Sequence, residues 1–325
     1  MDGYDAALFD LDGVVYLGPV AVDGAVEGLA ALRERGARIG FVTNNAARSP
    51  ETVVEHLVAL GIQATATDVV VSSQAAARLL AARLPAGSPI LVVGTEALVD
   101  QIRGVGLRQV EEGEEPVAVI QGYHPDLPWK LIDRACFAIH AGAPWIATNT
   151  DSTRPTDLGL VPGAGAQIEA VRRAVGIDPV VAGKPFSPLL EETIRRLDAQ
   201  RPIFVGDRID TDIDGAAAVG MESLFVFSGA HGKRDVIAAD NRPTHLGRDL
   251  RALVEPAAET VVEGGVAMSG PARVRRTATA WDIDAPRDPA GHLAAFRALT
   301  ALVPAGSDPT EPALAAALAQ LDQLP

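Results

Sequence analysis

The sequence predicts an α/β protein built on a parallel, Rossmann-like sheet. Short apolar runs that end in polar or acidic residues recur along the chain, and helical patterns separate them. Strands that alternate with helices are typical of βαβ units and a parallel sheet. With 325 residues, 48% of them hydrophobic, the chain is long enough for two or three domains with cores of their own.

The first predicted strand is the apolar run 6–9, which leads directly into Asp10, Leu11, Asp12 and Gly13. Because side chains alternate along a strand, Asp10 and Asp12 can point the same way. Two carboxylates at one spot repel each other and stay ionised together only beside a cation. The alternative interpretation is an ordinary Asp-Gly turn.

A second apolar run, 38–42, ends in Thr43, Asn44 and Asn45. A hydroxyl and freed backbone N–H groups just past a strand end suit phosphate oxygens, and ligands of open α/β sheets collect there. The alternative is an Asx-rich turn into a helix that begins at Ser49-Pro50, as N-cap and first helical residue. Both interpretations can hold together.

Two later segments also place charged residues after short apolar runs. In the stretch 180–185, Lys184 is the one charged residue, although a lone lysine is more often simply solvated. The apolar strand predicted at 202–206 ends in three acidic residues, Asp207, Asp210 and Asp212. For this segment the alternative is a strand, a turn and an Asp-capped helix.

Taken together and in this order, the four segments resemble the haloacid dehalogenase (HAD) superfamily of phosphotransferases. The matching motifs are DxDG from Asp10, the strand-end Thr43, Lys184, and GDxxxTD ending at Asp212, and the resemblance covers residues 5–250. It implies that Asp10 is a nucleophile that forms an aspartyl-phosphate and that Asp12 is the proton donor and acceptor. These two carboxyl groups would then need different environments.

The resemblance also implies a magnesium site. Its ligands would be the carboxylates of Asp10 and Asp207 and the backbone carbonyl of Asp12, with Mg²⁺ offsetting the charge of the approaching phosphate. Asp212 would orient Lys184 or a metal-bound water. Lys184 would pair with the phosphate and the nucleophile, and the phosphoryl oxygens would be held by Thr43, Asn44 and Asn45.

A cap domain is predicted between Thr43 and Lys184. The residues from Asp12 to Thr43 hold only a turn, a helix from Gly24 to Arg35 with Asp23 as candidate N-cap, and a strand. The segment after Thr43 contains further elements: strands at 90–93, 117–121 and 145–147, a helix capped by Thr95 and a helix over 129–140. This α/β insertion resembles the C2-type cap of the NagD-like subfamily (IIA), with the cap signature at 148–151 and 160–165.

Substrate choice is assigned to this cap. A lid of this size implies a small substrate, and Asp151 and Arg154 are the candidate specificity residues, although an exposed arginine is often only solvated. The subfamily includes pyridoxal phosphate, phosphoglycolate, nucleotide and broad-specificity para-nitrophenyl phosphatases as well as glycerol-phosphate phosphatases. A phosphometabolite-binding or assembly protein is the alternative from a different class.

Beyond residue 255 the sequence predicts a short α+β extension, with strands at 259–262 and 272–280 and helices at 289–302 and 311–324. Such a tail resembles that of the actinobacterial glycerol 3-phosphate phosphatases, which act in glycerophospholipid head-group recycling. Without an acyl-CoA pyrophosphate loop, it is expected to pack on the core or to support a homodimer. The predicted division is therefore core 1–82, cap 83–180, core 181–255 and extension 256–325.

Composition restricts the partners and the compartment. The net charge of −14, from 42 acidic and 28 basic residues, disfavours nucleic acid and anionic membranes as partners. No basic and apolar leader or spanning segment is recognised, so a cytoplasmic enzyme is expected. The single cysteine, Cys136, lies in an apolar helical pattern and is expected to pack in a core.

Overall fold

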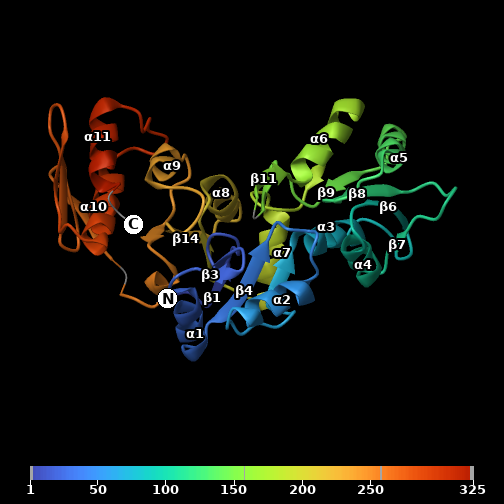
Figure 1. Cartoon of the computed structure of the whole chain (residues 1–325), viewed down its shortest axis with the longest axis horizontal. Helices are drawn as coiled ribbons and strands as arrows, with labels where there is room; N and C mark the ends of the chain where they lie inside the picture. The colour runs from blue at the N-terminus through green and yellow to red at the C-terminus, as the bar shows by residue number, and fades with distance from the viewer. Residues whose placement is uncertain (1–2, 157, 257, 323–325) are drawn as a thin grey trace. The chain divides into compact units, whose positions relative to one another are not determined.

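The computed structural model describes residues 3–156, 158–256 and 258–322. The chain splits into two compact units, one made of residues 1–37 and 203–325 and the other of residues 38–202. Both units combine helices with a parallel sheet, and the first unit also holds an antiparallel sheet (Figure 1), which confirms the predicted α/β class. Among the described residues the longest helix has 14 residues, and none is long and apolar enough to cross a bilayer.

The first unit carries the sheet from which both DxDG and GDxxxTD emerge. Its strands lie in the order β15-β14-β13-β1, and β13, β14 and β15 run parallel. All four residues of β1 are buried. Because β1 and β13 are neighbours, the acidic residues that follow them reach the same edge of the sheet. The elements are β1 (Ala6–Phe9), β13 (Pro202–Gly206), β14 (Glu222–Val226) and β15 (His245–Gly247), with α8 (Asp214–Ala218) and α9 (Lys233–Ala238).

The helix after β1 begins differently from our prediction. A small hairpin of β2 (Tyr16–Leu17) and β3 (Val20–Ala21) leads into α1 (Ala25–Glu34), whose N-cap is Gly24 at φ 78°. Asp23 is therefore not the N-cap. Its carboxylate instead accepts a hydrogen bond from Arg251 Nη2 at 2.7 Å, beside the 3₁₀ turn Leu250–Leu253. A long-range ion pair has drawn the side chain away from the helix end.

The C-terminal extension is a four-stranded antiparallel sheet with two helices. Its strands are β16 (Thr260–Glu263), β17 (Val266–Ser269), β18 (Ala272–Arg276) and β19 (Trp281–Asp284). The sequence predicted only two strands, at 259–262 and 272–280, so it missed β17 and β19, and β18 ends at Arg276, before the predicted end at residue 280. Helix α10 (Pro289–Leu302) has its predicted bounds, whereas α11 (Pro312–Leu321) begins after the N-cap Glu311, and the predicted end at residue 324 lies outside the described residues.

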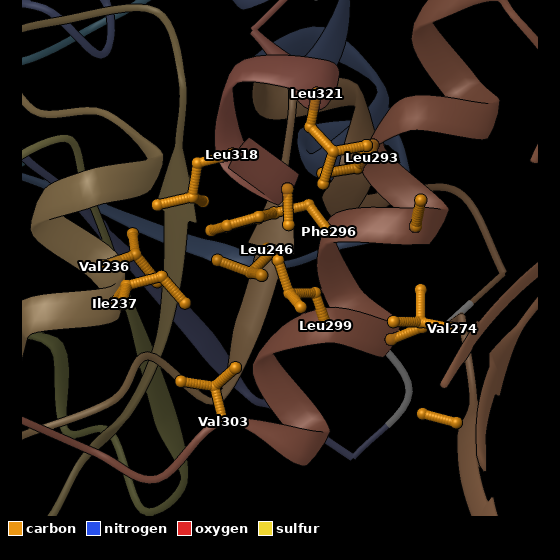
Figure 2. Close-up of a cluster of buried hydrophobic side chains, with 14 of the residues drawn as sticks. Val236, Ile237, Leu246, Val274, Leu293, Phe296, Leu299, Val303, Leu318 and Leu321 are labelled. Carbon is orange, nitrogen blue, oxygen red and sulfur yellow. The ribbon is translucent and has the colours of Figure 1, made fainter. Parts of the chain in front are cut away.

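The extension packs on the rest of the first unit. Side chains of α10 and α11 share one buried cluster with α9 and β15, shown in Figure 2. Hydrogen bonds also join the extension to the rest of the first unit: Arg297 donates to Leu246 O, and Gly306 N donates to Ala239 O at 2.9 Å. Packing on the core, one of the two roles expected for the tail, is therefore what the structure has.

The second unit contains a strand pair and a separate parallel sheet. β4 (Arg38–Thr43) pairs with β5 (Val69–Val71) and packs against α7 (Ser187–Leu197). Helix α2 (Pro50–Ala59) begins as predicted, with Ser49 Oγ accepting from Thr52 N. The sheet has the order β12-β9-β8-β6-β7. Its strands are β6 (Pro89–Val93), β7 (Arg108–Gln109), β8 (Ala118–Gln121), β9 (Trp145–Ala147) and β12 (Val180–Val181).

Helices and a hairpin complete this second unit. They are α3 (Ser72–Ala81), α4 (Glu96–Gly104), α5 (Trp129–His140) and α6 (Ala164–Val175), with a hairpin of β10 (Thr153–Thr156) and β11 (Gly159–Pro162). α5 has its predicted bounds and buries the free thiol of Cys136, as expected. Thr95 occupies the N-cap position of α4, but its hydroxyl makes no cap hydrogen bond. The predicted boundary between residues 180 and 181 falls inside β12, and the four-part division stays a prediction.

Candidate active site

Three carboxylates meet at one edge of the sheet in the first unit. Asp10 follows β1, Asp207 follows β13, and Asp212 lies in the π-helical turn Ile209–Ile213. One oxygen of each lies within 4.8 Å of the others, with Asp10 half-buried and the other two buried. The main chain joins the first two strands here, since Asp10 N donates to Val205 O at 2.9 Å. The sequence pattern placed these groups correctly at strand ends.

The carboxylate of Asp207 is enclosed by two glycines. A Cβ on Gly13 would lie 2.5 Å from Asp207 Oδ2, and one on Gly229 would lie 1.9 Å from the same atom. Ala230 N donates to this oxygen at 2.6 Å. Only glycine backbone fits this close to the carboxylate of Asp207, so the position of the carboxylate is closely defined.

The carboxylate of Asp212 is held by main-chain N–H groups. Its Oδ2 accepts from Asp207 N at 3.2 Å and from Arg208 N at 3.1 Å. A Cβ on Gly206 would lie 2.2 Å from Asp212 Cβ, so this approach requires glycine. The sequence predicted a supporting role for Asp212, and the structure puts it inside the carboxylate cluster itself.

The remaining acidic residues of these motifs, Asp12 and Asp210, are not part of the carboxylate cluster. The side chain of Asp12 is exposed, on the turn that Gly13 continues at φ 96°. Asp210, which the sequence left without a role, forms an exposed pair with Arg208 at 2.7 Å. Asp12 and Asp10 thus differ in exposure, and a difference in environment is what the predicted acid and base role of Asp12 beside Asp10 would need.

The cluster fits a magnesium ion. Three carboxylates this close repel one another, and burial raises the cost of their charges, so a cation is needed to keep them ionised. All the side-chain donors are oxygens, the ligands that Mg²⁺ prefers, and a small octahedral ion leaves positions for water and substrate. The enclosed carboxylate of Asp207 would supply the fixed ligand of such a site.

One loop of this site was not recognised from the sequence. Residues 228–231, which follow β14 and which we call the Asp207 loop, are not among the residues that the sequence predicted for the site. Besides the Asp207 contacts of Gly229 and Ala230, Ser228 Oγ donates to Gly13 O at 2.7 Å. His231 Nδ1 accepts from Ile209 N at 2.9 Å. The signal available was a third apolar strand ending in small residues, but glycine and alanine carry no chemistry to identify.

In the second unit, Asn44 organises the predicted phosphate-binding residues. Its Oδ1 accepts from Lys184 N at 2.8 Å, and its Nδ2 donates to Lys184 O at 3.0 Å and to Asp151 Oδ1 at 3.1 Å. Its carbonyl accepts from Asn149 Nδ2 and from Ser72 Oγ. Both ends of the amide side chain are thus engaged within the protein, and the phosphate contact of Asn44 stays a prediction. The side chain instead fixes Lys184, which is 2% exposed.

Thr43 and Asn45 flank this residue. Thr43 is buried, and its hydroxyl accepts from Asn45 N at 3.1 Å. Asn45 is exposed, and its side chain accepts from Ala47 N at 3.0 Å. This is the Asx turn that the alternative interpretation expected, and it leaves the Thr43 hydroxyl able to donate a hydrogen bond.

The two predicted cap residues differ in their surroundings. The carboxylate of Asp151 accepts a hydrogen bond from Asn44 Nδ2, and its main-chain N–H donates to Asn149 Oδ1 at 3.1 Å. Arg154 lies on β10 with its guanidinium 4.9 Å from the centroid of the Tyr123 ring. Stacking on an aromatic face orients an exposed arginine without neutralising it.

Replacing Asn44 by alanine is expected to destabilise the second unit strongly. The variant loses both hydrogen bonds to the Lys184 backbone at a buried position, which costs about 2–4 kcal/mol. Thermal unfolding measures this loss. In the matched Asn45→Ala variant only the exposed Asx turn is removed, at a cost of about 0.5 kcal/mol. Equal unfolding temperatures for the two variants would contradict the organising role of Asn44.

Comparison with known proteins identifies the family. Residues 7–108 match the family model described as haloacid dehalogenase-like hydrolase, and residues 181–253 match one described as HAD-hydrolase-like. The chain is 47% identical over 253 residues to the D-glycerol 3-phosphate phosphatase of Mycobacterium tuberculosis, covering 77% of this chain and 71% of that protein. The chain belongs to the haloacid dehalogenase-like hydrolases. The resemblance in the four motifs is thereby confirmed.

Two further comparisons support the assignment. The crystal structure of the glycerol phosphate phosphatase of Mycobacterium tuberculosis in complex with magnesium matches with a TM-score of 0.84 and 39% identity, covering 98% of both chains. A 5′-nucleotidase of Bacillus subtilis is 34% identical over 75% of this chain and 95% of its own length. The crystal structure therefore shares the fold of almost the whole chain, and the sequence match to the 5′-nucleotidase covers three quarters of it.

Proposed function

We propose that this HAD-like hydrolase is a Mg²⁺-dependent phosphomonoesterase that forms an aspartyl-phosphate and prefers glycerol 3-phosphate. The observation that carries the proposal is the carboxylate cluster of Asp10, Asp207 and Asp212, which needs a cation and holds a nucleophile at its edge. The 47% identity to a D-glycerol 3-phosphate phosphatase supports the substrate. The magnesium complex of the matching crystal structure supports the metal.

The carboxylates of Asp10 and Asp207 and the backbone carbonyl of Asp12 would hold the metal, with Asp212 beside them. Bound there, Mg²⁺ would neutralise charge on the phosphoryl oxygens. Asp10 Oδ attacks phosphorus, the bond from phosphorus to the ester oxygen breaks, and Asp12 gives its proton to the departing alcohol. Asp12 then takes a proton from water, whose oxygen attacks the aspartyl-phosphate, and phosphate and free Asp10 result.

The phosphoryl group would be held by residues of the second unit. We assign phosphate contacts to the Thr43 hydroxyl, to the Asn44 and Asn45 region and to the Lys184 ammonium. The burial of Lys184 and the anchoring of its backbone by Asn44 support this, because a fixed cation is a better phosphate partner than a mobile one. We assign contact with the leaving group to Asp151 and Arg154.

Two wider statements belong to the same proposal. We infer that the chain folds as core 1–82 and 181–255, cap 83–180 and extension 256–325. The family match at 181–253 supports the second core segment, whereas the match at 7–108 extends into the predicted cap. We also infer that the enzyme works in the cytoplasm, where phosphorylated metabolites are kept, either alone or as a homodimer.

A panel of phosphate esters tests the substrate. We expect kcat/KM for glycerol 3-phosphate to exceed that for pyridoxal phosphate, phosphoglycolate and p-nitrophenyl phosphate by about tenfold, or ~1.4 kcal/mol in transition-state binding. A nucleoside 5′-monophosphate is the strongest competitor, given the 34% identical 5′-nucleotidase. If it ranks first, the substrate assignment is wrong and the phosphatase assignment stands.

The same assay separates enzyme from binding protein. Activity should disappear in a chelator and return with added Mg²⁺. A protein that binds these esters but hydrolyses none of them with Mg²⁺ present would favour the phosphometabolite-binding alternative.

A further inference from the structure

The C-terminal extension touches both ends of the Asp207 loop. At the first end, Phe227 packs edge-on against Phe225, with ring centroids 5.0 Å apart, and against Phe296 at 5.7 Å. Phe296 comes from α10 and is fully buried. The residue directly before the loop is therefore held between its own strand and the extension.

The second end of the loop enters α9, which the extension covers. Val236 and Ile237 of α9 face Phe296 and Leu318 in the shared cluster (Figure 2). The side chain of Lys233, at the first position of α9, is only 9% exposed, and its Nζ lies 3.7 Å from Asp322 Oδ1 at the end of α11. Burial lowers the pKa of Lys233, and Asp322 opposes this shift.

The two ends also meet each other. Lys233 Nζ lies 6.0 Å from the centroid of the Phe227 ring, so the side chain just before the loop interacts with the first residue of α9. Further along, Gly306 N donates to Ala239 O and Arg242 donates to Pro304 O at 2.8 Å, which fixes the exit of α9 to the extension. A short loop with both ends fixed keeps few conformations.

We propose that the C-terminal extension is a positioning element for the metal site, acting through Phe296 on the Asp207 loop. The loop supplies the Ala230 N–H and the space at Gly229 that define the Asp207 carboxylate. Fixing the ends of the loop orders the Asp207 carboxylate before the metal binds. The entropic cost of ordering this ligand then does not reduce the affinity for the metal. The inference rests on the proposed magnesium site and adds a role for the extension.

The test compares two core variants of the full chain by their binding of Mg²⁺. Phe296→Leu removes the ring against Phe227. Val274→Ala is the matched control, because Val274 is equally buried in the cluster but lies on the opposite side of α10 from Val236 and Ile237 (Figure 2). Both should lower the unfolding temperature. Calorimetry of the folded proteins with Mg²⁺ alone gives the affinity, and amide hydrogen exchange reports on residues 229–231.

We expect Phe296→Leu to weaken Mg²⁺ binding about three- to tenfold, less than the ~10- to 100-fold typical of residues that contact a ligand directly. Exchange at residues 229–231 should rise in the same variant, and Val274→Ala should change neither. Unchanged affinity in Phe296→Leu, or an equal loss in Val274→Ala, would overturn the positioning role alone. A parent protein that binds no Mg²⁺ would instead overturn the proposed metal site.

Discussion

Asp10→Asn is expected to lower kcat by roughly 10⁴- to 10⁶-fold, the range found when an enzyme loses its nucleophile. The amide has nearly the shape of the carboxylate, so the half-buried site next to β1 stays filled. It cannot, however, attack phosphorus from an ionised oxygen, and it removes one negative charge from the cluster. Loss of activity without loss of fold is therefore the signature of this variant.

Rapid quenching of the parent enzyme with substrate, followed by mass spectrometry, should reveal a phosphate adduct on the peptide that contains Asp10. The adduct should be missing in Asp10→Asn. Asp210→Asn is the matched control, since Asp210 is an exposed carboxylate outside the carboxylate cluster, paired with Arg208 and lying 3.9 Å from His231 Nε2. It should retain full activity. Hydrolysis surviving in Asp10→Asn, or an adduct on another residue, would sink the covalent mechanism.

The parts of the site that sequence could predict are those whose chemistry is local. Asp10 and Asp207 each follow a buried apolar strand, and the carboxyl ends of neighbouring strands must share one edge. The bounds of α5 and α10 followed equally from their apolar periodicity and flanking residues. Such features need no knowledge of which distant segments pack together.

The parts that escaped prediction depend on long-range contacts. Gly229 and Ala230 matter only because Asp207, far earlier in the chain, lies against them. Asp23 would have been an adequate N-cap had Arg251 not been beside it. Likewise, the sequence around Asn44 does not indicate that its side-chain amide bonds to the backbone of Lys184. Residues that position others carry no signature of their own.

Gly229→Ala should test the enclosure of Asp207 most severely. The added methyl would lie 1.9 Å from Asp207 Oδ2, so the loop or the carboxylate must move by roughly 1 Å or more to restore an ordinary contact. The same movement draws Ala230 N away from that oxygen. We expect Mg²⁺ affinity to fall about 10- to 100-fold and kcat/KM to fall by about 10²-fold, the cost of a displacement of this size at a reacting centre.

Gly232→Ala makes the same chemical change just beyond the loop, where the nearest atom to the new methyl is Asp235 Oδ2 at 4.0 Å. Its φ of −127° suits any residue, so neither a clash nor backbone strain is expected. Calorimetric Mg²⁺ titration and ester hydrolysis should therefore leave Gly232→Ala unchanged while Gly229→Ala loses both. If Gly229→Ala binds Mg²⁺ like the parent, Asp207 does not need the enclosure that Gly13 and Gly229 form, and the metal must depend on other ligands.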